Sequence, residues 1–286
     1  MRQPKWHIHL MLVLVVLLIC GPVLYAVLVS TQSNADLFDF QLVPGDRLDE
    51  NFDAVWNNRN LGEFMKNSLI VSIVIAMAKI VTSMLAGLAF VYFKFPGKWI
   101  VFGFVLVTLL MPTEISILAL FKQISEMDWH KEPNLPFWLD WVPHVISDKA
   151  PPLGMVVPFF ASATGAFLFR QHFANLPADL SEAAQIDGVN PMQFLFKILI
   201  PLSWNAIGAL AVIQFIYGWN MYLWPLLLQP DDQVVQVGLA SLRNADQGQT
   251  YGPLMLGALL ASLPPIIVFL VLQKPFMKGM ALSRDK

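Results

Sequence analysis

The sequence predicts an all-α membrane protein with six transmembrane helices and an exposed cytoplasmic helix that does not cross the membrane, and composition is the first reason for this. Hydrophobic residues make up 56% of the 286 residues and charged residues 13%, whereas soluble domains carry about a quarter charged. The mean hydropathy is +0.59. A chain this apolar cannot cover a globular surface with polar groups, so a membrane protein is favoured. The net charge of −2 argues against a nucleic-acid partner.

Apolar runs of membrane-spanning length are the second reason. A bilayer core needs about 20 apolar residues as helix. Six runs satisfy this, at residues 10–31, 67–93, 99–121, 151–169, 198–228 and 254–273. The first run is longer than the core of a cleaved signal peptide, so we expect it to remain as a helix. Prolines in the last two runs are compatible with a membrane helix, because neighbouring groups can satisfy the carbonyls they free.

The distribution of charge between the runs predicts their orientation. With the N-terminus inside, the inner segments hold ten basic and four acidic residues. The outer segments, 32–66, 122–150 and 229–253, hold seven basic and fifteen acidic residues. This asymmetry follows the positive-inside rule, so both termini are expected in the cytoplasm.

A polar stretch between the fourth and fifth runs is the third reason. It contains EAAQIDGVNPMQFLFKILIP, residues 182–201. Pro177 favours a helix start and Gly188 a helix end, and Asn190 can cap a second helix. The first helix, at about 1.5 Å per residue, is too short to cross a membrane. Its acids and alanines suit docking into a protein groove better than lying on lipid.

This stretch resembles the EAA motif of the permeases of ABC importers. The matching residues are Glu182-Ala183-Ala184, Gly188, Ile198 and Pro201, and Ile200 stands where the motif usually has Leu. The runs ASATGAFLFRQHFANLPADLSEAAQIDG and FIYGWNMYLWPLLL are similar to carbohydrate-type permeases, in particular those of glycerol 3-phosphate importers. The resemblance covers most of residues 65–280 and implies one permease domain over residues 1–286.

The resemblance implies a function and a set of partners. The chain would be a bacterial inner-membrane permease for glycerol 3-phosphate or related glycerophosphodiesters, with another sugar or oligosaccharide as the alternative. It would form a heterodimer with a second permease and would require a dimer of ATP-binding subunits and an extracytoplasmic solute-binding protein. The resemblance also implies that the exposed cytoplasmic helix is a coupling helix, which docks on the ATP-binding subunit. Its expected ATPase-coupling residues are Glu182, Ala183, Ala184, Asp187 and Gly188.

The sequence contains no catalytic motif. No G-x-x-x-x-G-K-[ST] phosphate loop occurs, so ATP and Mg²⁺ are expected on the partner ATPase, and no cofactor is expected in this chain. The five histidines have no metal-ligand spacing, and we expect no enzyme activity. An ion-driven secondary transporter is a further alternative, but that class is built from internal repeats, and no convincing repeat relates the two halves.

Five polar residues within the apolar runs are candidates for the substrate path. Lys79 and Glu114 are the charged ones, and they either line the path or form a structural ion pair, because an isolated charge in the membrane is costly. Gln214, Tyr217 and Asn220 share one face at helical spacing. They either line a central cavity or, with the nearby tryptophan, belong to an interfacial aromatic belt.

The predicted orientation can be tested by thiol labelling in a Cys20→Ser background, since Cys20 is the only cysteine. Cysteines placed at Asp46 and Asp140 should react with a membrane-impermeant thiol reagent in intact cells. A cysteine placed at Lys98 should react only after the membrane is opened. Labelling of the Lys98 site in intact cells would contradict the topology.

Overall fold

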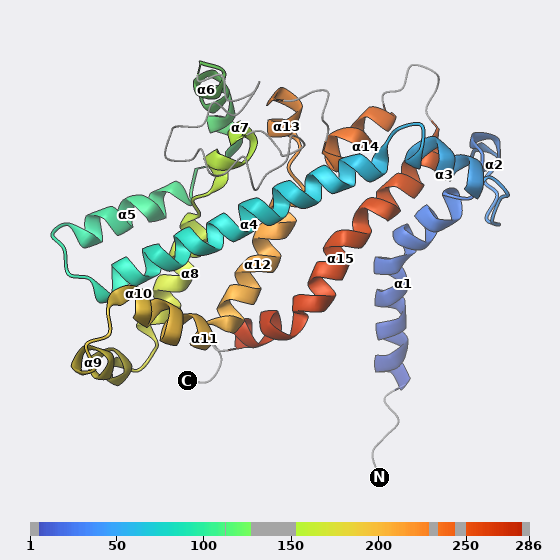
Figure 1. Cartoon of the computed structure of the whole chain (residues 1–286). Helices are drawn as coiled ribbons and strands as arrows, with labels where there is room; N and C mark the ends of the chain where they lie inside the picture. The colour runs from blue at the N-terminus through green and yellow to red at the C-terminus, as the bar shows by residue number, and fades with distance from the viewer. Residues whose placement is uncertain (1–5, 112, 127–152, 229–233, 244–249, 282–286) are drawn as a thin grey trace, which may run out of the picture. The chain divides into compact units, whose positions relative to one another are not determined.

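The structure is a computed structural model of the whole chain, and it describes residues 6–111, 113–126, 153–228, 234–243 and 250–281 (Figure 1). Within these residues all regular structure is helical, which confirms the all-α class. The helices are α1 (Trp6–Val29), α2 (Asn34–Phe38), α3 (Leu48–Trp56), α4 (Leu61–Tyr92), α5 (Lys98–Thr108), α6 (Thr113–Glu126), α7 (Leu153–Val156), η2 (Val157–Phe159), α8 (Ala163–Ala174), α9 (Ala178–Ile186), α10 (Pro191–Phe194), η3 (Leu195–Leu199), α11 (Ile200–Leu202), α12 (Trp204–Trp219), α13 (Leu223–Leu228), α14 (Val235–Arg243) and α15 (Tyr251–Ala281).

Three of the six apolar runs form single helices long and apolar enough to cross a membrane. They are the runs 10–31, 67–93 and 254–273, which form most of α1, the greater part of α4 and the middle of α15. Among the described residues a bent pair, Pro191–Leu202 with Trp204–Trp219, is apolar enough to count as a fourth if the two helices form one span. Most apolar side chains of α1 are exposed, as expected for a helix surrounded by lipid.

The run 99–121 is not one helix, contrary to the expectation. It divides into α5 and α6. The main-chain N–H groups of Leu109 and Leu110 close α5 with bonds to the carbonyls of Leu106 and Val107, respectively. Pro112 explains the division from sequence, because proline lacks an N–H and disfavours helical backbone in the residue before it.

The run 151–169 is also interrupted. The structure places α7 and η2 in its first part, and α8 begins only at Ala163. Ser162 caps α8, with its hydroxyl accepting a hydrogen bond from the Gly165 N–H at 3.1 Å. A serine with extended backbone ends one helical segment and starts the next, so the straight helix lies further along the chain than the apolar run indicated.

The run 198–228 begins with a bend of 81° rather than with a straight span. Residues 195–199 form a π-helical turn, and Ser203 closes the bend with N–H bonds to the carbonyls of Leu199 and Ile200 at 2.9 and 3.1 Å. Pro201 cannot donate the next helical bond, and π-turns bend helices where that ladder fails. Residues 198–203 therefore belong to the bent segment, and the straight helix is α12.

The chain divides into two compact units, and residues 1–66 with 234–264 form the first. Buried amides organise its loops. Asn51 donates through Nδ2 to the carbonyls of Ser30 and Gln32 at 2.9 and 3.1 Å. The main-chain N–H of Tyr251 donates to Asn34 Oδ1 at 3.0 Å. These bonds satisfy carbonyls beyond the end of α1 and fix the start of α15 beside α2.

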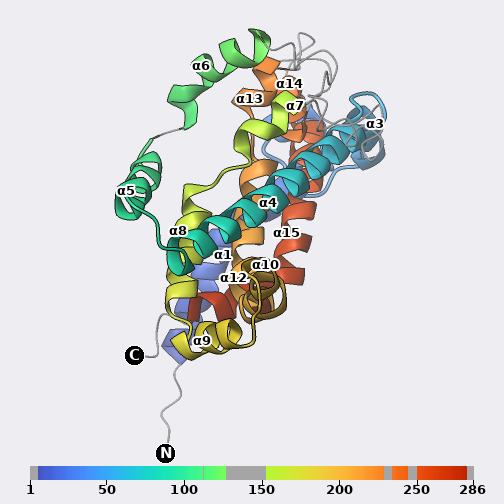
Figure 2. The same ribbon diagram turned by 60° about the vertical axis from the view of Figure 1, so that its left-hand side comes forward.

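Residues 67–233 with 265–286 form the second unit, in which α4 packs against α8 and α12 (Figures 1 and 2). Small residues permit the close approach. A Cβ on Gly87 of α4 would lie 2.7 Å from Phe169 Cβ of α8, and one on Gly218 of α12 would lie 2.8 Å from Ser72 Cα of α4. Membrane helices associate through such contacts, because lipid supplies little hydrophobic drive between them.

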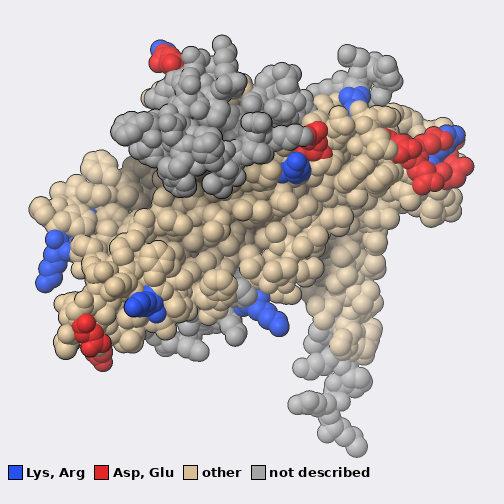
Figure 3. Space-filling view, in the orientation of Figure 1, with Lys and Arg blue, Asp and Glu red and all other residues tan. Residues whose placement is uncertain are grey.

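The described part of the face shown in Figure 3 is largely uncharged. Lysine, arginine, aspartate and glutamate atoms form small, scattered groups on the face shown in Figure 3, and other residues cover most of it. Such a surface is expected where lipid rather than water contacts the protein.

We expect Gly218→Ala to lower the free energy of unfolding by about 1–3 kcal/mol, because its methyl group would lie 2.8 Å from the Cα of Ser72, a main-chain atom of α4 that cannot move aside. Gly103→Ala is the matched control: this α5 glycine has nothing within 4 Å of an added Cβ. Thermal unfolding of the detergent-purified chain measures both. Equal stability of the two variants would contradict the packing described here.

Candidate functional site

The exposed helix α9 contains the EAA residues, as the sequence predicted. It is nine residues long, Ala178–Ile186. Pro177 is its N-cap with φ −56° and ψ 132°, so the proline precedes the first turn rather than occupying it. Asp179 lies in the first turn, where a negative charge stabilises the helix dipole.

The end of α9 explains the requirement for Gly188. Its φ is +69°, a region that residues with a Cβ rarely adopt. The N–H of Gly188 donates to Gln185 O at 3.1 Å, and the N–H of Val189 donates to Ala184 O at 2.9 Å. This is the Schellman arrangement that closes a helix. The predicted helix end at Gly188 is thus confirmed.

The second short helix also begins as predicted. Asn190 caps α10 and Pro191 is its first residue. The Asn190 side chain accepts a bond from the Gln193 N–H at 2.8 Å, and the Gln193 side chain accepts one from the Asn190 N–H at 3.4 Å. This capping box satisfies two main-chain donors and fixes the direction in which the chain leaves α9.

The five predicted coupling residues do not share one face. Glu182, Ala183, Asp187 and Gly188 are exposed. Ala184 is only 6% exposed and belongs to a buried cluster with Leu88 of α4 and Phe194 of α10. The sequence predicts that the acids and alanines of this helix dock together into a protein groove. This prediction is wrong for Ala184, whose side chain is buried and attaches α9 to its own chain.

The outward apolar residue of α9 is Ile186, which is 87% exposed. It lies between the acidic positions Glu182 and Asp187 in sequence. An isoleucine exposed to this degree at the end of a short helix offers a partner protein an apolar anchor flanked by carboxylates.

A groove of about 350 Å³ separates α9 from the end of α4. Tyr92, Ser181, Gln185, Val189 and Pro191 are among its lining residues. Tyr92 also stacks edge-on against Phe194, with ring centroids 5.1 Å apart. Helices α9 and α10 thus pack against the end of α4.

A second candidate site lies between α4 and α12. The Lys79 Nζ lies 3.8 Å from the centroid of the Tyr217 ring. Lys79 is 6% exposed, and no ion pair to it occurs among the described side chains. A cation stacked on an aromatic face gains electrostatic stabilisation, which is larger when water is excluded.

Gln214 and Ser162 extend this cluster. Gln214 is buried, and its Nε2 donates to the Ser162 Oγ at 3.4 Å. The Phe159 ring lies 6.3 Å from the Tyr217 ring. Sequence reasoning missed Ser162 and Phe159, although a serine directly before a helix is a recognisable capping signal. Of the predicted residues, Lys79 and Tyr217 are therefore in contact, and Gln214 lies about one helical turn before Tyr217 on α12.

The other two candidates for the substrate path are Asn220 and Glu114. Asn220 is exposed and ends α12 as its C-cap. Glu114 lies in the first turn of α6, but its side chain is outside the described part of the structure. The ion pair between Lys79 and Glu114 stays a prediction.

We expect Lys79 and Tyr217 to be energetically coupled. Tyr217→Leu should destabilise the chain, and its cost should be smaller by up to about 2 kcal/mol in the Lys79→Met background, where no cation faces the ring. Tyr222→Leu is the matched control, since Tyr222 is an exposed tyrosine nearby in sequence. Thermal unfolding in detergent measures the cycle. Additive losses for Lys79 and Tyr217 would exclude the interaction.

Comparisons with known proteins identify the family. Residues 79–281 match the family of the binding-protein-dependent transport system inner membrane component. The sn-glycerol-3-phosphate transport system permease protein UgpE of Rhizobium meliloti (strain 1021) is 35% identical over an alignment of 284 residues, and the alignment covers 95% of this chain and 94% of that protein. Its counterpart of the same name in Pectobacterium atrosepticum is 34% identical over 283 residues, with the same coverage.

Solved structures support the same fold. A bacterial ABC transporter involved in the import of the acidic polysaccharide alginate matches with a TM-score of 0.73 at 18% identity, over 94% of this chain and 95% of that chain. The resemblance of residues 182–201 to the EAA motif is thereby confirmed at the level of the family. The chain belongs to the inner membrane components of binding-protein-dependent transport systems, the permease subunits of ABC importers.

Proposed function

We propose that this chain is a permease subunit of an ATP-driven importer for glycerol 3-phosphate or related glycerophosphodiesters. The substrate assignment is supported by the 33–35% identity to permeases named for sn-glycerol-3-phosphate transport, over 95% of the chain. A second candidate is a sugar or oligosaccharide importer, which the fold match to an alginate transporter supports.

The proposed topology has six crossings with both termini in the cytoplasm. Three crossings are α1, α4 and α15, and α12 supplies a fourth. The remaining two would be made by the interrupted segments α5 with α6 and α7 with α8. Interrupted helices are compatible with a membrane where protein or a water-filled cavity satisfies their main chain. This arrangement places α9 and the loop between α4 and α5 on the cytoplasmic side.

We assign the outer face of α9 to docking on an ATP-binding partner. Ile186 would enter an apolar pocket of that subunit, and Glu182 and Asp187 would meet polar or basic groups at its rim. The inner face, through Ala184, rests on α4 and α10. Movement of the partner would therefore be passed to the membrane helices through a buried contact. ATP and Mg²⁺ belong to that partner in this proposal.

The other proposed partners complete the importer. A second permease would face this chain across the solute path, and an extracytoplasmic binding protein would deliver the solute. A periplasmic binding protein carrying alginate pentasaccharide is seen with the related transporter of known structure, which supports an arrangement of this kind.

The cluster around Lys79 is our candidate for the part of the solute path within this chain. Gln214 and Tyr217 offer hydrogen-bonding groups, and the lysine ammonium offers a positive charge for a phosphate. A phosphate entering an uncharged membrane interior would meet a large desolvation penalty. A buried lysine lowers that penalty for an anion, whereas it gives a neutral sugar no such advantage. Asn220 and Glu114 would lie further along the same path.

The experiment that tests the proposal uses vesicles that hold the whole importer, with ATP inside and the solute-binding protein present. We expect uptake of labelled glycerol 3-phosphate. Ile186→Asp should abolish uptake and co-purification of the ATP-binding subunits, because a charge replaces the exposed apolar anchor.

Ile186→Leu, which keeps an apolar side chain of the same size, is the control and should transport normally. Full uptake and full co-purification with Ile186→Asp would contradict docking through α9. Uptake of an oligosaccharide but not of glycerol 3-phosphate would overturn the substrate assignment and leave the coupling assignment intact.

A further inference from the structure

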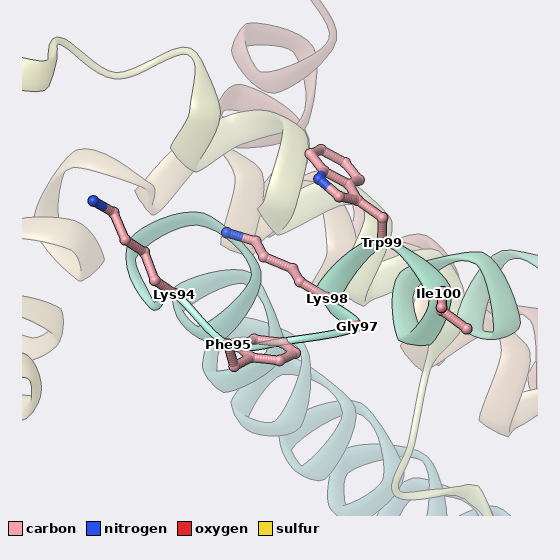
Figure 4. A pocket seen from close by; sticks show the side chains of 6 residues that line it. All are labelled: Lys94, Phe95, Gly97, Lys98, Trp99 and Ile100. Atoms are coloured by element: carbon pink, nitrogen blue, oxygen red, sulfur yellow. The ribbon is translucent and has the colours of Figure 1, made fainter.

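A basic hollow of about 440 Å³ lies where α4 turns into α5, at a distance in sequence from the coupling helix and from the Lys79 cluster. Its lining residues are Lys94, Phe95, Gly97, Lys98, Trp99 and Ile100. In the view of Figure 4 both lysine side chains extend to the same side of the loop, with the Trp99 indole beside them and Phe95 on the other side. The hollow thus combines two cations with an aromatic wall, and its lining contains no carboxylate.

Lys98 is held in place by the end of α4. Its Nζ donates to Phe93 O at 3.1 Å and to Val91 O at 3.4 Å. These are among the last carbonyls of that helix and its exit, and a cation there is stabilised by the helix dipole. An ammonium group has three donors, so one remains for a ligand. Lys94 is exposed and makes no ion pair among the described residues.

A third cation supports the aromatic wall. The guanidinium carbon of Arg170 in α8 lies 4.9 Å from the Trp99 ring centroid and 4.5 Å from that of Phe102. Stacking on two rings fixes both the arginine and the indole. The Trp99 ring is therefore positioned rather than free, although it is 67% exposed.

The flank of α5 beside the hollow is apolar and open. Ile100 is 68% exposed and Phe104 is 69% exposed. A soluble anion in the hollow would leave these side chains uncovered, whereas a lipid would cover them with its acyl chains. Tryptophan and lysine together at the end of an apolar helix are the combination that meets phospholipid headgroups.

We propose that this hollow binds the phosphate of an anionic phospholipid, with Lys94 and Lys98 on the headgroup, Trp99 at the glycerol level and Ile100 and Phe104 along the acyl chain. The proposed inward orientation places the site in the cytoplasmic leaflet. The lipid would join α4, on which the coupling helix rests, to α5 and α8. It is a resident of the protein's surface and is distinct from the transported solute.

Native mass spectrometry of the full-length chain in neutral detergent tests this, since lipid retention in detergent depends neither on transport nor on orientation. The probes are phosphatidylglycerol, phosphatidylcholine and glycerol 3-phosphate. We expect retention of phosphatidylglycerol over phosphatidylcholine. Lys94→Gln should weaken phosphatidylglycerol binding about five-fold, the factor that one lysine near an anionic surface supplies.

Lys197→Gln is the matched control, because Lys197 is an exposed lysine of η3 outside the hollow, and it should leave binding unchanged. Lys94 is exposed, so its substitution should preserve folding, which size-exclusion chromatography checks. Equal effects of the two variants, or equal retention of both lipids, would overturn the proposal. Binding of glycerol 3-phosphate with the same dependence on Lys94 would assign the hollow to a soluble phosphate instead.

Discussion

The close approach of α4 to α8 and α12 is the contact on which both candidate sites depend. Gly87 and Gly218 bring main-chain and side-chain atoms of neighbouring helices within distances that a Cβ would not permit. In a bilayer, packing of this kind is a principal source of helix association, because the apolar side chains are equally well solvated by lipid. Lys79 can reach Tyr217 only because the two helices are this close. The C-terminal end of the same helix, α4, packs against α9.

The positions at which the apolar runs break into separate helices are set by main-chain hydrogen bonding, not by hydrophobicity. The runs that divide contain a proline or a capping serine at the break, and each break leaves main-chain groups that need new partners. At the bend before α12 the structure supplies them through a π-turn and the N–H of Ser203. A bend of 81° redirects the chain from the coupling segment into the membrane helix. The bend thus links the exposed helix α9, through α10, to the largely buried helix α12.

Three lysines of the second unit lie in three different environments. Lys79 is buried against an aromatic ring. A charge in such a position has an unfavourable free energy, so its presence suggests a functional role. Lys98 caps the carbonyls at the end of α4, which is a structural role. Lys94 is exposed next to it and keeps its charge available. The three environments separate a candidate for the solute path from a candidate for the lipid surface without any difference in residue type.

The sequence by itself determined the features that depend on neighbours along the chain. The long apolar runs within α1, α4 and α15, the end of α9 at Gly188 and the cap at Asn190 are all local, so composition and spacing were enough to predict them. The EAA residues likewise identified the family, since they lie in one contiguous stretch. Ser162 is the exception: its capping role is local, yet a long apolar run concealed it.

Tertiary structure decided which side of each helix is buried and which is exposed. Ala183 and Ala184 are identical in chemistry and adjacent in sequence, yet one is exposed and the other is packed under α9 against α4 and α10. No local signal distinguishes them, because the burial of Ala184 comes from residues some 90 positions earlier and ten positions later. The pairing of Lys79 with Tyr217 was undetermined for the same reason. Helical spacing gives the faces of a helix, but only the packing of distant helices decides which face meets which.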